Sequence, residues 1–478
     1  MYPELSLFVE AERLDATGRR REPVVNPATG QSLGLLPYAS AGDLDRALES
    51  AQRAFSTWKS VPARNRAAIL KRGAELIRER ADAIAHVLTM EQGKTLTESR
   101  GEVSVSADVI EWYAEEGRRA YGRIIPSATP GTRQSVVLEP VGVALAVTPW
   151  NFPALTPCRK IGAALAAGCT LILKASEETP GTALELTQAL HDAGLPPGVL
   201  NLVFGEPASV TAHLLASPII RKLSFTGSVP VGKRLLTSTA QHLQRTTLEL
   251  GGHAPVLVFD DVDVERVAGL LVSGKFRNAG QICISPTRFY IHERIFDAFV
   301  EHFTARARSL RLGEGLLEGT DMGPLTNTRR QTAMEQFVAD ATSRGARVRS
   351  GGDRQGDRGY FFQPTVVTDP PDDSKVMTQE PFGPVVPITR FATLDEVIHR
   401  ANSLPVGLAA YAFTASNEIA LAVGELLRAG MVGVNTLNVS TPETPFGGVR
   451  ESGFGQEGGL EGMQPYLDVK FIAHACKP

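Results

Sequence analysis

Apolar residues recur at three- and four-residue spacing through most of residues 42–120. The stretches 41–58 (AGDLDRALESAQRAFSTW) and 64–92 (RNRAAILKRGAELIRERADAIAHVLTMEQ) carry this period most clearly. A period near 3.6 puts the apolar side chains on one face of a helix, so the pattern predicts a mostly helical N-terminal region. The stretch that follows, TRQSVVL at 132–138, predicts an extended ribbon.

From residue 141 the pattern changes to short apolar runs that alternate with helical stretches. Such alternation is typical of a parallel, doubly wound α/β sheet. It resumes after residue 252 and continues to about 435, so the sequence predicts two α/β domains, with one more strand in the tail at 465–475. The predicted strands are 141–147, 170–174, 199–204, 222–225, 255–259 and 288–292, and the predicted helices are 154–167, 179–193, 262–277 and 294–309.

Length and charge narrow the class of protein. A chain of 478 residues suits two or three domains. Its formal net charge of -3 gives no electrostatic case for binding nucleic acid or an anionic membrane. No stretch approaches the roughly 18 consecutive apolar residues of a membrane helix, and the N-terminus lacks the regions of a signal peptide. We therefore expect a cytoplasmic protein with no nucleic-acid or membrane partner.

The four cysteines, Cys158, Cys169, Cys283 and Cys476, match neither a disulfide framework nor a CxxC pair. Four cysteines in so long a chain predict reduced thiols. The nine histidines include no HExxH motif, so we expect no metal site.

Two glycine-rich segments are candidates for phosphate binding. GFGQEGG at 453–459 contains a literal GxGxxG, but it follows a charged loop and precedes a strand-like tail, so we reject it. SFTGSVPVG at 224–232 fits better, because a strand that ends at Phe225 leads through a turn to Ser228, which can cap a helix. The free N–H groups of that helix would face a phosphate. An ordinary β–α turn explains these residues equally well when they are taken alone.

The stretch FRNAGQICIS, residues 276–285, contains Cys283. A free cysteine is either a reactive thiol or a small buried hydrophobe, and the local sequence does not decide between them.

Several motifs taken together resemble the aldehyde dehydrogenase superfamily, and most closely its NAD(P)-dependent succinate-semialdehyde dehydrogenases. The resemblance covers essentially the whole chain. The motifs are NPATG (26–30), TPWNFP (148–153), LILKASEETP (171–180), SFTGS (224–228), ELGGHAP (249–255), FRNAGQIC (276–283), EPFGP (380–384) and PFGGVRESG (445–453).

The resemblance implies an aldehyde dehydrogenase-like α/β fold, with two doubly wound parallel-sheet domains and a small β oligomerisation element. By it, residues 1–117 and 139–251 form the NAD-binding domain and residues 252–447 the catalytic domain. Residues 118–138 and 448–478 form the oligomerisation element, so a homodimer or homotetramer is expected.

The resemblance also implies a covalent mechanism. An aldehyde carbon has no electron pair with which to expel hydride, so a thiolate must first attack the carbonyl and form a thiohemiacetal. Cys283 fits the nucleophile. The Asn151 side chain and the Cys283 backbone N–H would stabilise the oxyanion. Hydride loss leaves a thioester, and Glu249 matches the base that activates the hydrolytic water.

The cofactor residues are likewise implied by the resemblance. Gly227 and Ser228 would hold the pyrophosphate, with Trp150 nearby. Glu380 would hold the nicotinamide ribose, and Phe382 would pack beside the ring.

The resemblance implies three further cofactor-binding residues, Lys174, Ser176 and Glu177. Lys174 and Glu177 would contact the adenosine ribose. A carboxylate there accepts hydrogen bonds from the ribose hydroxyls and repels a 2′-phosphate, which predicts NAD over NADP. Lys174 could still attract a phosphate, so NADP stays possible.

The predicted substrate is a small aldehyde that carries an anionic group. Arg159, Arg277 and Ser440 resemble the carboxylate-binding set of succinate-semialdehyde dehydrogenases, and two guanidinium groups suit a carboxylate. Glutarate semialdehyde or a sulfonated aldehyde would satisfy the same charges. Four alternatives remain: structural ion pairs for one or both arginines, a neutral aliphatic or aromatic substrate, a CoA-acylating enzyme, and an inactive structural homologue. Residue 285 is serine, so the two-cysteine redox switch of animal succinate-semialdehyde dehydrogenases is not expected.

Overall fold

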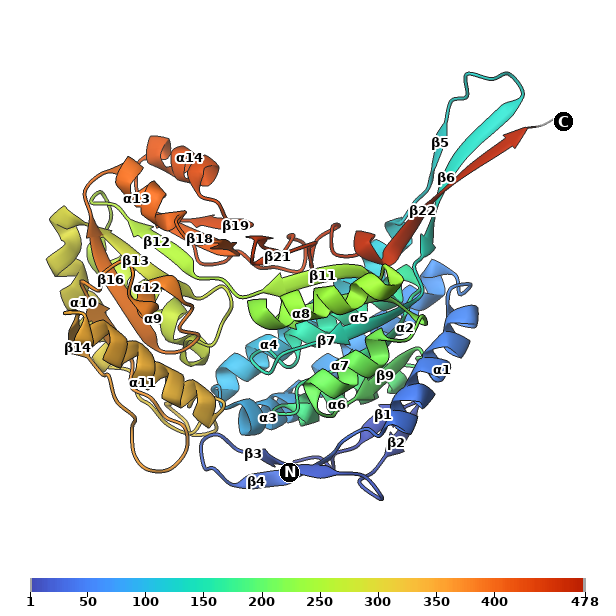
Figure 1. Ribbon diagram of the computed structural model, residues 1–478, viewed down its shortest axis with the longest axis horizontal. Helices are drawn as coiled ribbons and strands as arrows, with labels where there is room; N and C mark the ends of the chain where they lie inside the picture. Colours follow the sequence, from blue (N-terminus) through green and yellow to red (C-terminus); the bar gives the residue numbers. More distant parts are fainter. Residues whose placement is uncertain (1, 476–478) are drawn as a thin grey trace.

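The computed structural model describes residues 2–475. Two α/β bodies lie side by side, and a three-stranded arm projects from the N-terminal one (Figure 1). No helix within 2–475 is both long and apolar enough to cross a membrane.

The first body is built on an eight-stranded sheet with the order β2-β1-β9-β8-β7-β10-β11-β21. Its five central strands, β9, β8, β7, β10 and β11, are parallel. The strands β1 and β21 that flank them run antiparallel to their neighbours, and β2 pairs antiparallel with β1. The strands are β1 (Leu7–Val9), β2 (Glu12–Leu14), β7 (Val143–Val147), β8 (Thr170–Lys174), β9 (Leu200–Val203), β10 (Ile220–Gly227), β11 (Arg245–Leu250) and β21 (Gly453–Phe454).

Helices cover both faces of this sheet. Strands β7 and β8 are therefore buried along their whole length, which explains why they are continuous apolar runs in the sequence. Leu171 and Leu173 pack on one face, against α2 to α6, whereas Ile172 packs on the other, against α1, α7 and α8. The helices are α1 (Ala41–Trp58), α2 (Ala63–Glu79), α3 (Ala81–Gln92), α4 (Leu96–Glu116), α5 (Leu155–Ala167), α6 (Pro180–Asp192), α7 (Pro207–Leu215) and α8 (Val229–Thr239).

The second body has a seven-stranded sheet with the order β14-β15-β16-β13-β12-β18-β19, parallel except for β14. The strands are β12 (Ala254–Val258), β13 (Pro286–His292), β14 (Arg347–Ser350), β15 (Thr365–Thr368), β16 (Val385–Phe391), β18 (Ala409–Phe413) and β19 (Met431–Val434). The helices are α9 (Val264–Phe276), α10 (Phe296–Arg308), α11 (Thr328–Ser343), α12 (Lys375–Thr378), α13 (Leu394–Ala401) and α14 (Asn417–Leu426).

The predicted fold class, α/β with parallel sheets in two bodies, is confirmed. The expected helical region at 42–120 is four helices, α1 to α4. The apolar periodicity missed several elements. Among them are the strands β1 and β2 and the hairpin of β3 (Arg21–Val25) and β4 (Ser32–Pro37). Helix α11 and the strands β14 to β16 were also missed, in a stretch that the pattern left as loop-rich.

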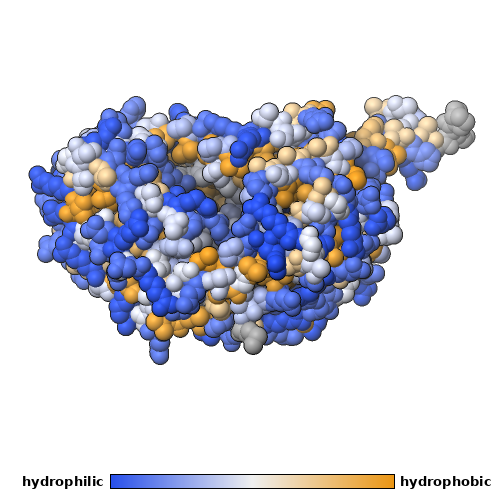
Figure 2. Space-filling model, turned by 60° about the horizontal axis from the view of Figure 1, so that its bottom comes forward, coloured by the Kyte–Doolittle hydropathy of each residue, from blue (hydrophilic) through white to orange (hydrophobic). Residues whose placement is uncertain are grey.

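The arm joins the C-terminal strand β22 (Leu467–Ala475) to β6 (Thr132–Pro140), and β6 to β5 (Arg123–Ile125). Strands β22 and β6 pair antiparallel from Leu467↔Pro140 to Ala475↔Thr132. The segment before β22 does not join the arm, because β21 pairs with β11 instead, and β20 (Val449–Arg450) pairs with β17 (Val406–Gly407). Figure 2 shows apolar residues along the arm. The large exposed ones are Tyr121, Ile124, Val469, Phe471 and Ile472.

Candidate functional site

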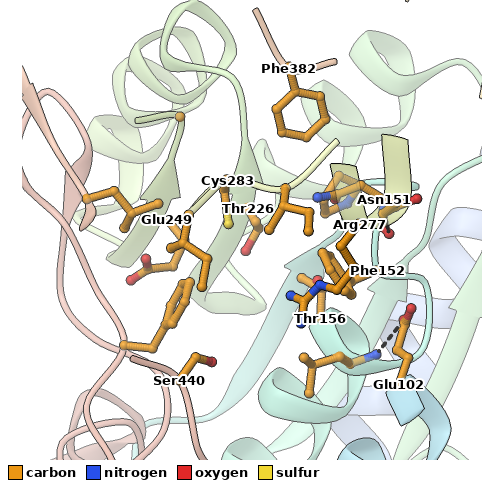
Figure 3. A pocket seen from close by; sticks show the side chains of 18 of the residues that line it. Glu102, Asn151, Phe152, Thr156, Thr226, Glu249, Arg277, Cys283, Phe382 and Ser440 are labelled. Atoms are coloured by element: carbon orange, nitrogen blue, oxygen red, sulfur yellow. Dashed lines mark hydrogen bonds between the residues drawn. The ribbon is translucent and has the colours of Figure 1, made fainter. Parts of the chain in front are cut away.

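A cavity of about 940 Å³ lies where loops at the carboxyl ends of strands from both sheets meet. Ligands of open α/β sheets bind at such edges. Cys283 lies near its centre, with Glu249 on one side and Asn151 on the other (Figure 3). The cavity lining contains most of the residues singled out from the sequence: Trp150, Asn151, Arg159, Gly227, Ser228, Glu249, Arg277, Cys283, Glu380, Phe382 and Ser440.

Three of the expected residues do not line this cavity: Lys174, Ser176 and Glu177. Lys174 is the last residue of β8 and pairs in register with Val147, the last residue of β7. Lys174, Ser176 and Glu177 therefore lie at the same carboxyl edge of the sheet as the segment that follows β7. The carboxylate of Glu177 binds the Lys174 ammonium at 2.6 Å and accepts a 3.2 Å hydrogen bond from the Gly205 N–H. Ser176 Oγ donates to Glu178 at 3.2 Å.

The loop before Cys283 adopts an unusual backbone. After α9 ends at Phe276, Asn278, Ala279 and Gly280 all have left-handed φ angles of 50°, 50° and 74°. The left-handed conformation costs roughly 1–2 kcal/mol per non-glycine residue. A Cβ at residue 280 would clash with the Gly383 carbonyl oxygen, so only glycine fits there. This strained turn brings the thiol into the cavity.

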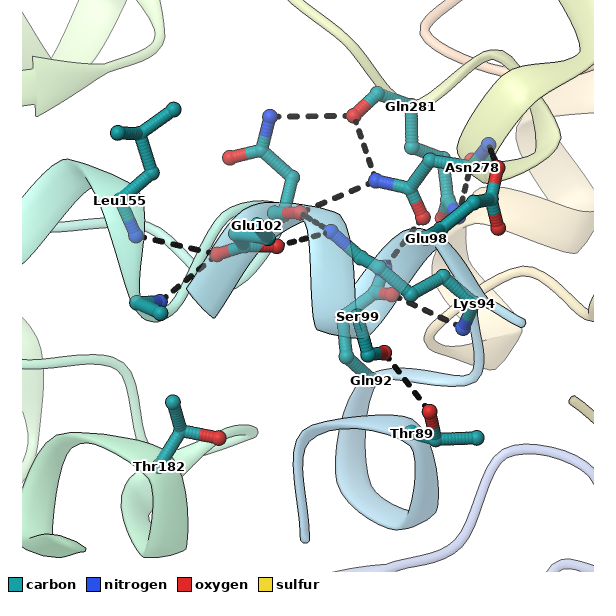
Figure 4. Close-up of polar contacts among 12 residues, drawn as sticks. Thr89, Gln92, Lys94, Glu98, Ser99, Glu102, Leu155, Thr182, Asn278 and Gln281 are labelled. Atoms are coloured by element: carbon teal, nitrogen blue, oxygen red, sulfur yellow. Dashed lines mark hydrogen bonds and ion pairs between the residues drawn. The ribbon is translucent and has the colours of Figure 1, made fainter. Parts of the chain in front are cut away.

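Asn278 holds the turn in place, and the sequence motifs did not single it out. Its backbone N–H donates to Glu98 at 2.7 Å, and its Oδ1 accepts from Gln92 at 2.8 Å (Figure 4). Its Nδ2 donates to the Asn151 carbonyl at 3.0 Å. Asparagine adopts the left-handed region more readily than most residues, and this preference is the sequence feature that could have pointed to Asn278.

Asn151 faces the loop that leads to Cys283, residues 277–283, from the segment after β7. It is 5% exposed, and its Nδ2 donates to the Gln281 carbonyl at 3.1 Å. An amide nitrogen has two hydrogens, so one donor stays available to a ligand oxygen.

Glu249 is the second-last residue of β11 and is 2% exposed. Neither carboxylate oxygen has a hydrogen-bond partner among the described residues. Burial, and next the charge of Glu457, raise the pKa of Glu249 well above its ordinary value. A buried carboxyl group without partners is costly in a structural role and suits a group that exchanges protons.

The Cys283 thiol is partly open to the cavity. Burial, followed by the nearby Glu380, raises its pKa to about 12, and Arg159 opposes this shift. In the ligand-free protein the thiol is therefore protonated at neutral pH.

The other described cysteines form no disulfide. Cys158 and Cys169 are buried free thiols, and burial raises the pKa of Cys169 to about 11. The expectation for Cys476 lies outside the described residues.

The end of the cavity lined by Trp150, Phe382 and Glu380 has features of a site for a polar ligand. The rings of Trp150 and Phe382 meet edge to face, with centroids 5.6 Å apart. Burial raises the pKa of Glu380 to about 8. Three buried polar atoms near this end lack partners among residues 2–475: Thr226 Oγ1, Lys275 Nζ and Arg330 Nε. Buried polar atoms are normally paired, so this set indicates a missing polar ligand.

Ser228 precedes α8 as expected, but its side chain makes no capping bond, and β10 runs on to Gly227 rather than ending at Phe225. The N-terminal N–H groups of α8 are thus not capped by Ser228 and stay available to an anion.

The two arginines reach the cavity in different ways. Arg159 is 6% exposed, its Nη2 donates to Ser440 Oγ at 2.6 Å, and its guanidinium lies 4.1 Å from the Phe446 ring centroid. Its buried Nε has no partner among the described residues. Arg277 is exposed and lies beside Phe152 and Thr156 (Figure 3). Neither arginine forms an ion pair within 2–475, although both line the cavity.

Comparisons with known proteins agree over the whole chain. Residues 14–472 match the aldehyde dehydrogenase family. The chain is 50% identical to the 4-(hydroxymethyl)benzenesulfonate dehydrogenase of Comamonas testosteroni, covering 98% of each chain. It is 42% identical to the NADP(+) succinate-semialdehyde dehydrogenase of Escherichia coli, covering 97% of this chain and 96% of that one.

A solved structure gives the same result. The succinate-semialdehyde dehydrogenase of Burkholderia pseudomallei superposes with a TM-score of 0.97, at 42% identity and with 98% of each chain covered. The expected aldehyde dehydrogenase-like fold is confirmed. The chain therefore belongs to the aldehyde dehydrogenase family, whose members oxidise aldehydes with NAD or NADP.

Proposed function

We propose that this enzyme oxidises an aldehyde bearing an anionic group to its carboxylic acid, preferably with NAD, and that Cys283 is the nucleophile. One observation carries the proposal: Cys283, Asn151, Glu249 and two arginines without ion pairs line one cavity. Inactive structural homologues have no need to keep this set together.

Cys283 attacks the aldehyde carbon and forms a C–S bond, while its proton passes to a base. Asn151 Nδ2 and the Cys283 backbone N–H stabilise the oxyanion that forms. Arg159 favours the thiolate, because its positive charge opposes the upward shift of the Cys283 pKa. Hydride loss from the thiohemiacetal carbon then leaves a thioester on Cys283.

Glu249 completes the cycle. In its carboxylate form Glu249 takes a proton from water, and its raised pKa makes that carboxylate a stronger base. The resulting hydroxide attacks the thioester. The C–S bond breaks, and the acid and the free thiol are released. Hydrolysis needs this base, whereas transfer to CoA does not, so Glu249 favours a hydrolytic enzyme.

When bound, the dinucleotide supplies the hydride acceptor. Glu380 would hold the nicotinamide ribose, with Phe382 and Trp150 beside the ring, and Gly227 and Ser228 would bind the pyrophosphate. The unpartnered Thr226 Oγ1 fits a polar ligand at the same place. Lys174, Ser176 and Glu177 would bind the adenosine ribose.

Arg159, Arg277 and Ser440 would bind the anionic group of the substrate. Succinate semialdehyde is the first candidate, in line with relatives named for succinate and glutarate semialdehydes. A sulfonated benzaldehyde is the second. Two observations favour it: the relative with 50% sequence identity is named for a benzenesulfonate, and the rings of Phe152 and Phe446 line the cavity.

We also propose the division of labour expected from the sequence. Residues 1–117 and 139–251 would bind the cofactor, and residues 252–447 would carry the nucleophile. Of the expected oligomerisation element, 118–138 with 448–478, the part that forms the arm with β22 would mediate a homodimer or homotetramer. The apolar residues exposed on the arm support this last role. The cytoplasmic location stays a prediction.

The test is NADH formation at 340 nm with succinate semialdehyde, glutarate semialdehyde, 4-formylbenzenesulfonate, propanal and benzaldehyde. We expect kcat/KM to be highest for one of the three anions, and Cys283→Ala to abolish turnover. Turnover of the neutral aldehydes alone would reject the anionic substrate but keep the nucleophile. Turnover that survives in Cys283→Ala would reject the mechanism.

A further inference from the structure

We propose that Lys94 and Glu102 are positioning residues for catalysis, which hold Asn151 and the first turn of α5 against the nucleophile loop. The proposal rests on the role proposed for Asn151 above. Neither residue belongs to the motifs by which the chain resembles its family. Both lie on the N-terminal helical segment, far from residue 151 in sequence, and both line the cavity.

Glu102 supplies a helix cap that α5 lacks. Residue 154 precedes α5 and is an alanine, which makes no side-chain cap, and the first turn of α5 contains no acidic residue. Glu102 Oε1 instead accepts from the Ala154 N–H at 2.8 Å and from the Leu155 N–H at 3.1 Å. A carboxylate at this place satisfies two free N–H groups and favours the helix dipole. The helix start is thereby fixed from α4 rather than by its own sequence.

Lys94 binds the residue that precedes this helix start. Its Nζ lies 2.5 Å from Glu102 Oε2 and donates to the Asn151 carbonyl at 2.8 Å. The same ammonium lies 4.0 Å from the centroid of the Phe152 ring. One buried cation therefore contacts residues 151 and 152 directly, and contacts residues 154 and 155 through Glu102.

The Asn151 carbonyl is the point where two parts of the active site meet. It accepts from Lys94 Nζ and also from Asn278 Nδ2, which lies in the left-handed turn before Cys283 (Figure 4). The side chain of the same Asn151 donates to the Gln281 carbonyl. The oxyanion donor and the nucleophile loop are thus tied to each other and to Lys94.

The pair is poorly explained as a stabilising element alone. Both side chains are 1% exposed, and a buried ion pair stabilises a fold no better than well-packed apolar residues of similar size. The pair instead fixes the position of the backbone, because each of its hydrogen bonds holds one backbone atom beside the reacting groups. A misplacement of about 1 Å in such groups costs on the order of 100-fold in rate.

The test compares Lys94→Met and Glu102→Gln, each made in the native chain and in an Asn151→Ala chain. The assay is hydrolysis of p-nitrophenyl acetate, which needs the thiol and the oxyanion donors but no cofactor. We expect each change to lower kcat by about 10- to 100-fold with little change in KM, since loss of an oxyanion donor costs about 100- to 1,000-fold. In the Asn151→Ala chain the same changes should cost less than about twofold, because they act through the residue already removed. Equal factors in both chains would overturn the proposal.

Glu91→Gln is the matched control. Glu91 also caps a helix, accepting from the Gly181 and Thr182 N–H groups of α6, but that helix does not carry Asn151. We expect it to lower the melting temperature as Glu102→Gln does, with kcat for the ester unchanged. A fall in kcat as large as that of Glu102→Gln would assign the effect to stability.

Amide hydrogen exchange, measured by mass spectrometry, tests the contacts of Lys94 and Glu102 without an activity assay. We expect faster exchange at 150–158 and 278–283 in Lys94→Met and Glu102→Gln, and not in Glu91→Gln. Unchanged exchange in the first two variants would overturn the proposal even if no aldehyde is oxidised, which separates its failure from failure of the proposed function.

Discussion

The Nζ atom of Lys174 lies 2.6 Å from Oε1 of Glu177, and it also contacts Oε2 at 2.7 Å. The Lys174 side chain is 4% exposed, and its ammonium charge is balanced by this carboxylate. A 2′-phosphate on the ribose would have to displace or repel Glu177 before it could reach Lys174. This arrangement supports the NAD preference proposed above.

Removing that carboxylate should shift the cofactor preference. In Glu177→Ser the Lys174 ammonium becomes free to bind a phosphate, so kcat/KM for NADP should rise on the order of 10-fold or more, as expected for one new charge-assisted hydrogen bond. The value for NAD should fall, because the ribose hydroxyls lose their acceptor. Steady-state kinetics with both cofactors measures this. Glu178→Gln, next along the chain, serves as the charge control, and a native enzyme that already favours NADP would contradict the interpretation.

The two arginines should act on KM for anionic aldehydes. A hydrogen bond to a charged group contributes about 1.5–3 kcal/mol, so Arg159→Met or Arg277→Met should raise KM for succinate semialdehyde or 4-formylbenzenesulfonate about 10- to 100-fold. KM for benzaldehyde should change little. Arg53→Met, at an exposed ion pair on α1, is the control. Equal changes in KM for charged and neutral substrates would make the arginines structural.

The pKa of Cys283 determines how the alkylation rate of its thiol depends on pH. Because that pKa is raised to about 12, alkylation by iodoacetamide in the cofactor-free enzyme should keep rising above pH 9, whereas an ordinary cysteine levels off near its pKa of about 8.5. Quenched samples analysed by mass spectrometry give the rate at Cys283. A plateau below pH 9 would contradict the assignment.

Glu380 should account for part of that shift. Its charge is the largest electrostatic cause of the raised Cys283 pKa, and its own pKa is about 8. Glu380→Gln should therefore lower the pKa of Cys283 and speed alkylation above pH 8, where the native carboxylate is charged. Below pH 7 the two proteins should react alike, because the native carboxyl group is then neutral. Equal rates at pH 9 would exclude this coupling.

The arm should control assembly. Phe471 is 56% exposed on β22, and an apolar edge strand of this kind invites pairing with another chain. Phe471→Glu should yield a 51.3 kDa monomer in light scattering, whereas the native chain should be two or four times larger. Leu317→Glu changes an apolar residue of similar exposure, 62%, outside the arm and should leave the assembly intact. A monomeric native chain would reject the oligomerisation role.

Much of the fold could be predicted from local sequence. VALAV at 143–147 and TLILK at 170–174 are buried on both faces, so their apolar runs identified them as central parallel strands. Strands β14 to β16 were missed because they are interspersed with turns and loops, which obscures a short strand pattern. Many of the cavity-lining residues were identified from the family resemblance, whereas Lys94 and Glu102, which also line the cavity, were not.

The segment TMEQGKTLTESRGE, residues 89–102, shows why local sequence does not identify such buried polar residues. Its composition is that of a solvated helix connection, but Gln92, Lys94 and Glu102 are each at most 5% exposed. Their polarity is matched by groups from residues 151–155 and from the nucleophile loop, which only the folded chain brings near. No local pattern distinguishes such a residue from a surface one.

The sequence by itself determined the alternation of strands and helices, the family, and the candidate site residues, because each depends on local pattern or on motifs. Only the tertiary structure decided which of them share a cavity, that the Glu249 carboxylate has no hydrogen-bond partner within 2–475, and that Lys94 and Glu102 contact Asn151 and the first turn of α5. These are properties of burial and of contacts between distant segments, and they exist only once the two sheets and the N-terminal helices have packed together.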